Sequence, residues 1–66
     1  MTMFHFTAKI GKRETSGQFY SYTQEAAIAY IANTWQDQYG KRFHLLTVRP
    51  LTAQEELQVK AGQFNG

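Results

Sequence analysis

Two basic triplets, Gly11-Lys12-Arg13 and Gly40-Lys41-Arg42, carry the clearest chemical potential in this chain. Lysine and arginine side chains in turns contact phosphates without competing with strand pairing, and backbone N–H groups of glycine-containing turns add donors. The triplets therefore indicate a phosphate-binding surface, provided that the fold brings them together. A structural explanation also stands, because turn cations are well solvated and cations after a helix interact favourably with its dipole.

A second candidate surface is the sheet face opposite the long helix. We expect Phe4, Phe6, Phe19, Leu46 and Val48 to form the core, which leaves aromatic, polar and cationic residues on the other face: His5, Thr7, Lys9, Tyr20, Tyr22, Phe43, Leu45 and Arg49. Such a face could stack unpaired bases or bind a protein. A third alternative is that the C-terminal helix covers it through Ala53, Leu57 and Ala61.

Catalytic and metal-binding chemistry is not indicated, and we expect no cofactor. The chain has no cysteine, and its two histidines, His5 and His44, lack a clear acidic third ligand. No spacing places a nucleophile with a base and an orienting acid. We therefore expect a protein that is not an enzyme.

Alternating apolar residues predict the strands that must position these groups. Residues 3–10 alternate with a period of two, residues 18–22 form a second strand, and residues 43–49 form a third that Pro50 ends. The glycine-bounded polar stretch from Gly11 to Gly17 is interpreted as a hairpin loop.

Helix signals fill the remaining segments. Thr23 is a favoured N-cap for a helix that runs to Tyr39, and Gly40 suits the position after it. The apolar stripe of this helix is predicted to contain Ile28, Ile31, Ala32, Trp35 and Tyr39. A capping box that begins at Thr52 starts a short helix to about Lys60.

These elements predict an α+β domain of order β-β-α-β-α, with a three-stranded antiparallel sheet in the order 2-1-3. One long helix packs on the sheet, and a short helix follows near the C-terminus. In this topology both basic triplets lie at the same end of the molecule. Residues 1–66 form a single small domain, and we expect residues 62–66 to be a frayed tail.

The remaining features narrow the class of protein. The chain shows neither a signal-peptide pattern nor an apolar run long enough for a membrane span, so we expect a cytoplasmic protein without a membrane partner. A homodimer that completes the small core is an open alternative.

The expected function is that of a non-catalytic binding protein. Its basic turns would contact nucleic acid or a nucleoprotein through Lys12, Arg13, Lys41 and Arg42, with Lys9 and Arg49 extending the track. The alternative is a protein-interaction module or stoichiometric inhibitor that uses Tyr20, Tyr22 and Phe43. Accessory proteins of phages and mobile elements, such as anti-CRISPR proteins, often have this size, which is a likeness of size and not of residues.

Overall fold

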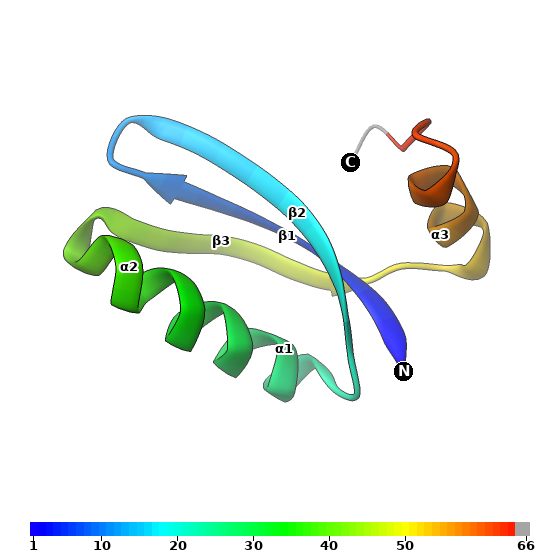
Figure 1. Ribbon diagram of the computed structural model, residues 1–66, viewed down its shortest axis with the longest axis horizontal. Helices are drawn as coiled ribbons and strands as arrows, with labels where there is room; N and C mark the ends of the chain where they lie inside the picture. The colour runs from blue at the N-terminus through cyan, green and yellow to red at the C-terminus, as the bar shows by residue number, and fades with distance from the viewer. Residues whose placement is uncertain (65–66) are drawn as a thin grey trace.

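A computed structural model describes residues 1–64 as one antiparallel sheet with a long helix across one face (Figure 1). The strands are β1 (Thr2–Ile10), β2 (Arg13–Ser21) and β3 (Phe43–Pro50), in the order β2-β1-β3. The helical segments are α1 (Gln24–Ile31), η1 (Ala32–Gln36), α2 (Asp37–Tyr39), η2 (Gly40–Arg42) and α3 (Ala53–Lys60). The predicted α+β fold and strand order are confirmed.

The long helix comprises α1, η1 and α2 without a break. Thr23 caps its start, because the Thr23 hydroxyl accepts a hydrogen bond of 3.0 Å from the Ala26 N–H. Its middle, η1, is a π-helical segment that ends at Gln36. Gly40 follows with a φ of 62°, a conformation that favours glycine. Both end signals were predicted from the sequence.

The helix buries a slightly different stripe from the predicted one. Ala27 and Ile31 are buried, whereas Ile28 is 41% exposed. Trp35 and Tyr39 remain half-buried, as expected for positions one and two turns further along this face. Ala27 therefore belongs to the buried stripe, and Ile28 lies at its border.

The β1–β2 connection is much tighter than the predicted loop of residues 11–17. β2 begins at Arg13, and Ile10 pairs with Arg13 across a two-residue turn of Gly11 and Lys12. Gly11 has a φ of 62°, and no residue other than glycine has a positive φ among the described residues. A positive φ at the first central position is the pattern of a type II′ hairpin turn, which matches the twist of the flanking strands.

A β-bulge in β3 overturns the predicted faces of that strand. Thr7 pairs with Thr47 and Ala8 with Leu45, so Leu46 is the extra residue. Phe43 and Leu45 therefore point to the same face as Val48, toward the long helix. Phe43 is only 6% exposed, while Leu46, which was expected in the core, is 51% exposed.

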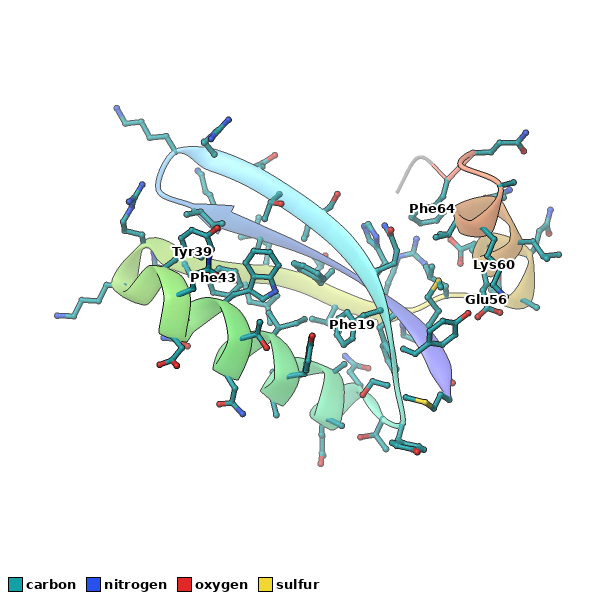
Figure 2. The ribbon with its side chains drawn as sticks, viewed as in Figure 1. Phe19, Tyr39, Phe43, Glu56, Lys60 and Phe64 are labelled. Carbon is teal, nitrogen blue, oxygen red and sulfur yellow. The ribbon has the colours of Figure 1, made fainter. Side chains whose placement is uncertain are left out.

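The core lies between the sheet and the long helix. Phe6, Ala8, Ile31 and Phe43 are its buried members, and the partly buried hydrophobic residues packed against them are Ile10, Phe19, Trp35, Tyr39, Leu45 and Val48. The rings of Phe19, Tyr39 and Phe43 all project between the sheet and the long helix (Figure 2). The molecule measures 34 × 24 × 15 Å, consistent with two layers of secondary structure.

α3 lies on the opposite side of the sheet, beside the end where β1 starts (Figure 1). The predicted capping box is present, with reciprocal hydrogen bonds between Thr52 and Glu55. Ala53, Leu57 and Ala61, the stripe expected to cover the sheet, are all exposed. The contacts come instead from Glu55 and from Phe64, whose ring lies 5.2 Å from that of His5.

Residues 62–64 belong to the tail that was expected to fray (residues 62–66), and their backbone makes defined hydrogen bonds; residues 65–66 lie outside the described residues. Gly62 has a φ of 74°. The Gly62 N–H donates to the Val59 carbonyl at 3.1 Å, and the Gln63 N–H donates to the Gln58 carbonyl at 2.8 Å. These two bonds form a Schellman cap, which turns the chain back and brings Phe64 to the sheet.

Candidate nucleic-acid interface

The structure joins the two basic turns directly. The Gly11 N–H donates a hydrogen bond of 2.9 Å to the carbonyl oxygen of Arg42. The Arg42 side chain also lies against Gly11, because a Cβ atom built at Gly11 would be 3.5 Å from Arg42 Nη2. Such a distance is ordinary van der Waals contact, so glycine is favoured here by its positive φ and not by a need for space.

The four cations of the basic turns, Lys12, Arg13, Lys41 and Arg42, are all exposed. No ion pair involves them among residues 1–64. Together with Lys9, the four cations supply five positive charges at this end, and Glu14 and Asp37 supply two negative charges, so this end carries a formal charge of +3. The rest of the chain carries −1, which gives the net charge of +2. The positive charge is therefore concentrated at one end, although the net charge is small.

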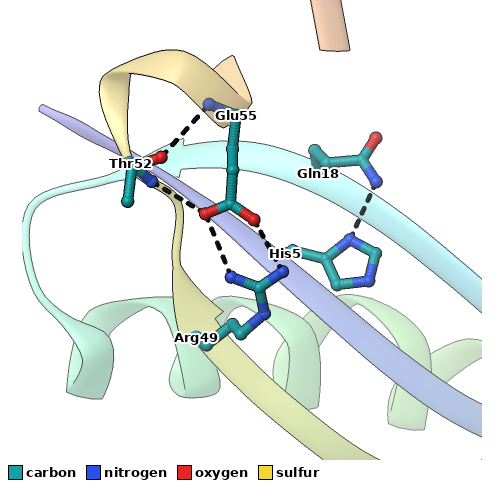
Figure 3. Close-up of polar contacts among 5 residues, drawn as sticks. All are labelled: His5, Gln18, Arg49, Thr52 and Glu55. Atoms are coloured by element: carbon teal, nitrogen blue, oxygen red, sulfur yellow. Dashed lines mark hydrogen bonds and ion pairs between the residues drawn. The ribbon is translucent and has the colours of Figure 1, made fainter. Parts of the chain in front are cut away.

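Lys9 and Arg49, the two cations predicted to extend the track, have different surroundings. Lys9 is exposed on β1 one pair away from the turn, and its register partners are Glu14 and His44. Arg49 lies near the far end of β3 and is engaged by Glu55, with bonds of 2.9 and 3.2 Å (Figure 3). The prediction of a phosphate-contacting Arg49 is therefore not supported by its position.

Glu55 connects α3 to the sheet. Its carboxylate accepts hydrogen bonds from the Arg49 guanidinium and, at 3.1 Å, from the Thr52 N–H. The Arg49 hydrogen bond, followed by the Thr52 N–H, lowers the pKa of Glu55 from 4.5 to about 2. Arg49 thus acts at the junction of the sheet and α3.

His5, which the sequence placed on the sheet face opposite the long helix, is 2% exposed next to α3. Gln18 donates to His5 Nδ1 at 2.8 Å, which leaves the proton of the neutral ring on Nε2 (Figure 3). Nε2 is buried without a hydrogen-bond partner among the described residues. Burial, and then the Arg49 charge, lowers the pKa of His5 below 6.5, against a smaller opposing effect of Glu55.

The predicted aromatic surface is only partly formed. Tyr20 and Tyr22 are exposed by 42% and 78%, but Phe43 is buried in the core and cannot contribute to it. The part of the sheet face nearer the basic turns is polar instead, with Thr7 and Thr47 joined by a hydrogen bond of 2.6 Å. A shallow depression of about 330 Å³ lies there, lined by Thr7, Glu14, Thr15, Ser16 and Leu46.

Sequence reasoning missed the aromatic residues that accompany the basic turns. Trp35 and Tyr39 were predicted on the core-facing stripe and do pack against the core, but both also line a hollow of about 480 Å³ beside Arg13 and Arg42. A signal was available for Tyr39, because it directly precedes the second basic triplet. Trp35 has no such local signal, since only the tertiary packing brings β2 beside it.

Residues 1–64 contain no group of three or more histidine, aspartate or glutamate side chains with the geometry of a metal site. Within the same range, every helix falls short of the length and hydrophobicity that a bilayer crossing requires. No family model, curated protein or solved structure matches this chain.

Proposed function

We propose that this chain is a non-catalytic, cytoplasmic binding protein that contacts nucleic acid, free or in a nucleoprotein complex, through its basic turns. The observation that carries the proposal is the hydrogen bond between the Gly11 N–H and the Arg42 carbonyl. It links four exposed cations from distant parts of the sequence into one surface. Such a surface follows a phosphate backbone, and each neutralised phosphate releases counterions.

The expected binding is non-specific in its electrostatic part and steeply dependent on salt. Four phosphate contacts correspond to a slope of about −3 to −4 in a plot of log affinity against log salt. Affinity should therefore fall on the order of 100-fold between about 50 and 200 mM salt. Fluorescence anisotropy with labelled DNA and RNA oligonucleotides measures both the affinity and the slope.

A matched pair of variants tests whether the basic turns are responsible. Lys12→Ala/Lys41→Ala removes one exposed cation from each turn, and Gln54→Glu/Gln63→Glu changes the net charge equally through exposed residues near α3. The first variant should reduce the salt slope by about 2, because each lost phosphate contact reduces it by about 1. Equal weakening by the second variant would mean that net charge alone governs binding, and absence of binding at low salt would refute the proposal.

A second candidate function is a protein-binding module or stoichiometric inhibitor, favoured by the exposure of Tyr20 and Tyr22. Exposed tyrosines are typical of protein interfaces. This alternative predicts a complex that is insensitive to salt and that Tyr20→Ala/Tyr22→Ala abolishes. Loss of a partner with this variant and not with Lys12→Ala/Lys41→Ala would favour the alternative over nucleic-acid binding.

A further inference from the structure

A hollow opens between the hairpin and the end of the long helix, directly beside the basic turns. Its volume is about 480 Å³, within the range of roughly 300–1,000 Å³ typical of small-molecule sites. It is lined by Ile10, Arg13, Glu14, Thr15, Trp35, Tyr39 and Arg42. One arginine comes from each basic turn, so the hollow and the candidate phosphate-binding surface are continuous.

Aromatic rings form one wall of this hollow. The Trp35 ring is nearly parallel to that of Tyr39, at 10° and a centroid distance of 5.8 Å, and to that of Phe43, at 12° and 6.3 Å. Phe43 is buried, but Trp35 and Tyr39 are only half-buried and line the hollow. Trp35 and Tyr39 are thus the two aromatic residues of the hollow that remain partly accessible, and a planar ligand can meet them there.

We infer that the hollow binds one unpaired nucleobase of a single strand, while Arg13 and Arg42 contact the adjoining phosphates; this inference rests on the function proposed above. Single-stranded nucleic acids are bound by a cationic surface along the backbone combined with aromatic rings on which bases stack. Both components line the same hollow here.

Of the remaining lining residues, Thr15 pairs with Ala8 and therefore faces the long helix, so its hydroxyl can hydrogen-bond a base. Glu14 pairs with Lys9, so its side chain points to the opposite face of the sheet. A base inside a duplex is already stacked and paired, so it must leave the helix before it reaches Trp35 or Tyr39. The surface should therefore prefer single strands to duplexes.

Trp35 provides a direct probe, because it is the only tryptophan in the chain. Its fluorescence would be titrated with a short single-stranded DNA, a duplex of the same sequence, adenosine monophosphate, phosphotyrosine and inorganic phosphate. We expect the single strand to quench Trp35 and to bind about 10-fold or more tightly than the duplex. The mononucleotide should quench more weakly, and inorganic phosphate should leave the fluorescence unchanged.

Variants at the aromatic wall separate stacking from charge. Tyr39→Leu should weaken single-strand binding roughly 5- to 160-fold, the range that corresponds to the loss of one base-stacking ring, with an unchanged salt slope. Tyr39→Phe should retain binding, because this variant keeps the aromatic ring and loses only the hydroxyl group. Tyr30→Leu is the matched control, because Tyr30 is exposed on the same helix and contacts Phe19 away from the hollow.

The outcomes distinguish this inference from the function on which it rests. Equal binding of single strand and duplex without quenching of Trp35 overturns the inference and leaves the basic turns as the binding surface. Quenching by phosphotyrosine but not by oligonucleotides, or by inorganic phosphate alone, also overturns it. Absence of nucleic-acid binding at low salt refutes the proposed function itself.

Discussion

At Gly17, in the middle of β2, the backbone lies directly over a core ring. Gly17 pairs with Phe6, and a Cβ atom at this position would be 2.9 Å from Phe6 Cε1 and 3.3 Å from Cζ. Phe6 cannot shift freely, because the rings of Phe19 and Trp35 both lie 6.0 Å from it. Glycine is therefore favoured at position 17 because it leaves space for the Phe6 ring, and not because of its φ angle.

We therefore expect Gly17→Ala to destabilise the protein. Overpacking of a core costs about 1–3 kcal/mol, which exceeds the roughly 0.5–1 kcal/mol that alanine gains over glycine in a strand. Chemical denaturation followed by Trp35 fluorescence measures the change. Ser16→Ala, at the neighbouring exposed position, should stay within about 0.5 kcal/mol of the wild type; a Gly17→Ala protein as stable as this control would contradict the packing at Phe6.

His5 makes stability depend on pH. Its pKa in the folded protein lies below 6.5, so the unfolded chain takes up a proton first as the pH falls. Stability is thus fully present above about pH 6.5 and declines below it. The pKa of Glu55 falls from 4.5 to about 2, so the Glu55 contribution is lost only at more acidic pH.

We expect His5→Gln to flatten this dependence between about pH 7.5 and 5.5. Glutamine cannot become charged in this range, whereas the buried histidine must do so beside Arg49. Urea denaturation at several pH values is the measurement. His44→Gln, at an exposed position of β3, is the matched control and should keep the wild-type profile; a flat wild-type profile would show that His5 is not buried in its neutral form.

At the scale of elements, α3 is attached to the sheet by few contacts. It has no buried residue, and its position depends on the pair of Arg49 and Glu55, the Schellman cap at Gly62 and the ring of Phe64. An exposed ion pair alone contributes at most about 1 kcal/mol. Glu55 matters more because the same carboxylate completes the capping box with Thr52.

Glu55→Ala should loosen α3 without disturbing the rest of the fold. The substitution removes half of the capping box and the partner of Arg49, so it should weaken the attachment of α3 to the sheet. Faster hydrogen exchange of the amides in residues 53–60, with unchanged exchange in β1, is the expected result. Glu56→Ala removes a carboxylate from the same helical turn, but one without an ion-pair partner among the described residues, and should have little effect; equal acceleration in both variants would argue against this anchor.

At the scale of the whole molecule, the candidate interface and α3 lie at opposite ends. The basic turns lie at the end of the sheet where α2 meets β3, and α3 lies beside the start of β1 (Figure 1). The core cluster around Phe6 and Ile31 contains no residue of α3. The two ends should therefore be separable.

A chain that stops after Thr52 should keep the sheet, the long helix and the binding properties of the basic turns. It retains Leu51, which is buried and donates its N–H to the Met3 carbonyl at 2.8 Å. Loss of the Phe64 ring from its edge-on contact with His5 should reduce stability by about 0.5–1.5 kcal/mol, the value of an aromatic pair. Circular dichroism and anisotropy measure the two properties; loss of nucleic-acid binding by a folded truncated chain would contradict the separation.

Local signals were sufficient to predict the number, type and order of the elements and the meeting of the basic turns, but not where β2 begins. Thr23, Gly40 and the capping box at Thr52 act through hydrogen bonds or dihedral angles within a few residues, so the sequence reports them directly. Matched element lengths then require the two turns to lie at one end. The Gly11–Arg42 hydrogen bond realises this expectation at atomic scale.

Only the tertiary structure decided which side chains face the core and which form the site. A shift of one residue moves a strand's side chains to the other face, and the bulge at Leu46 makes this shift inside β3, which buries Phe43. The hollow beside Trp35 likewise depends on the hairpin register and on the packing of β2 against the helix. These contacts join residues far apart in the chain, so their energies leave no pattern in any local stretch of sequence.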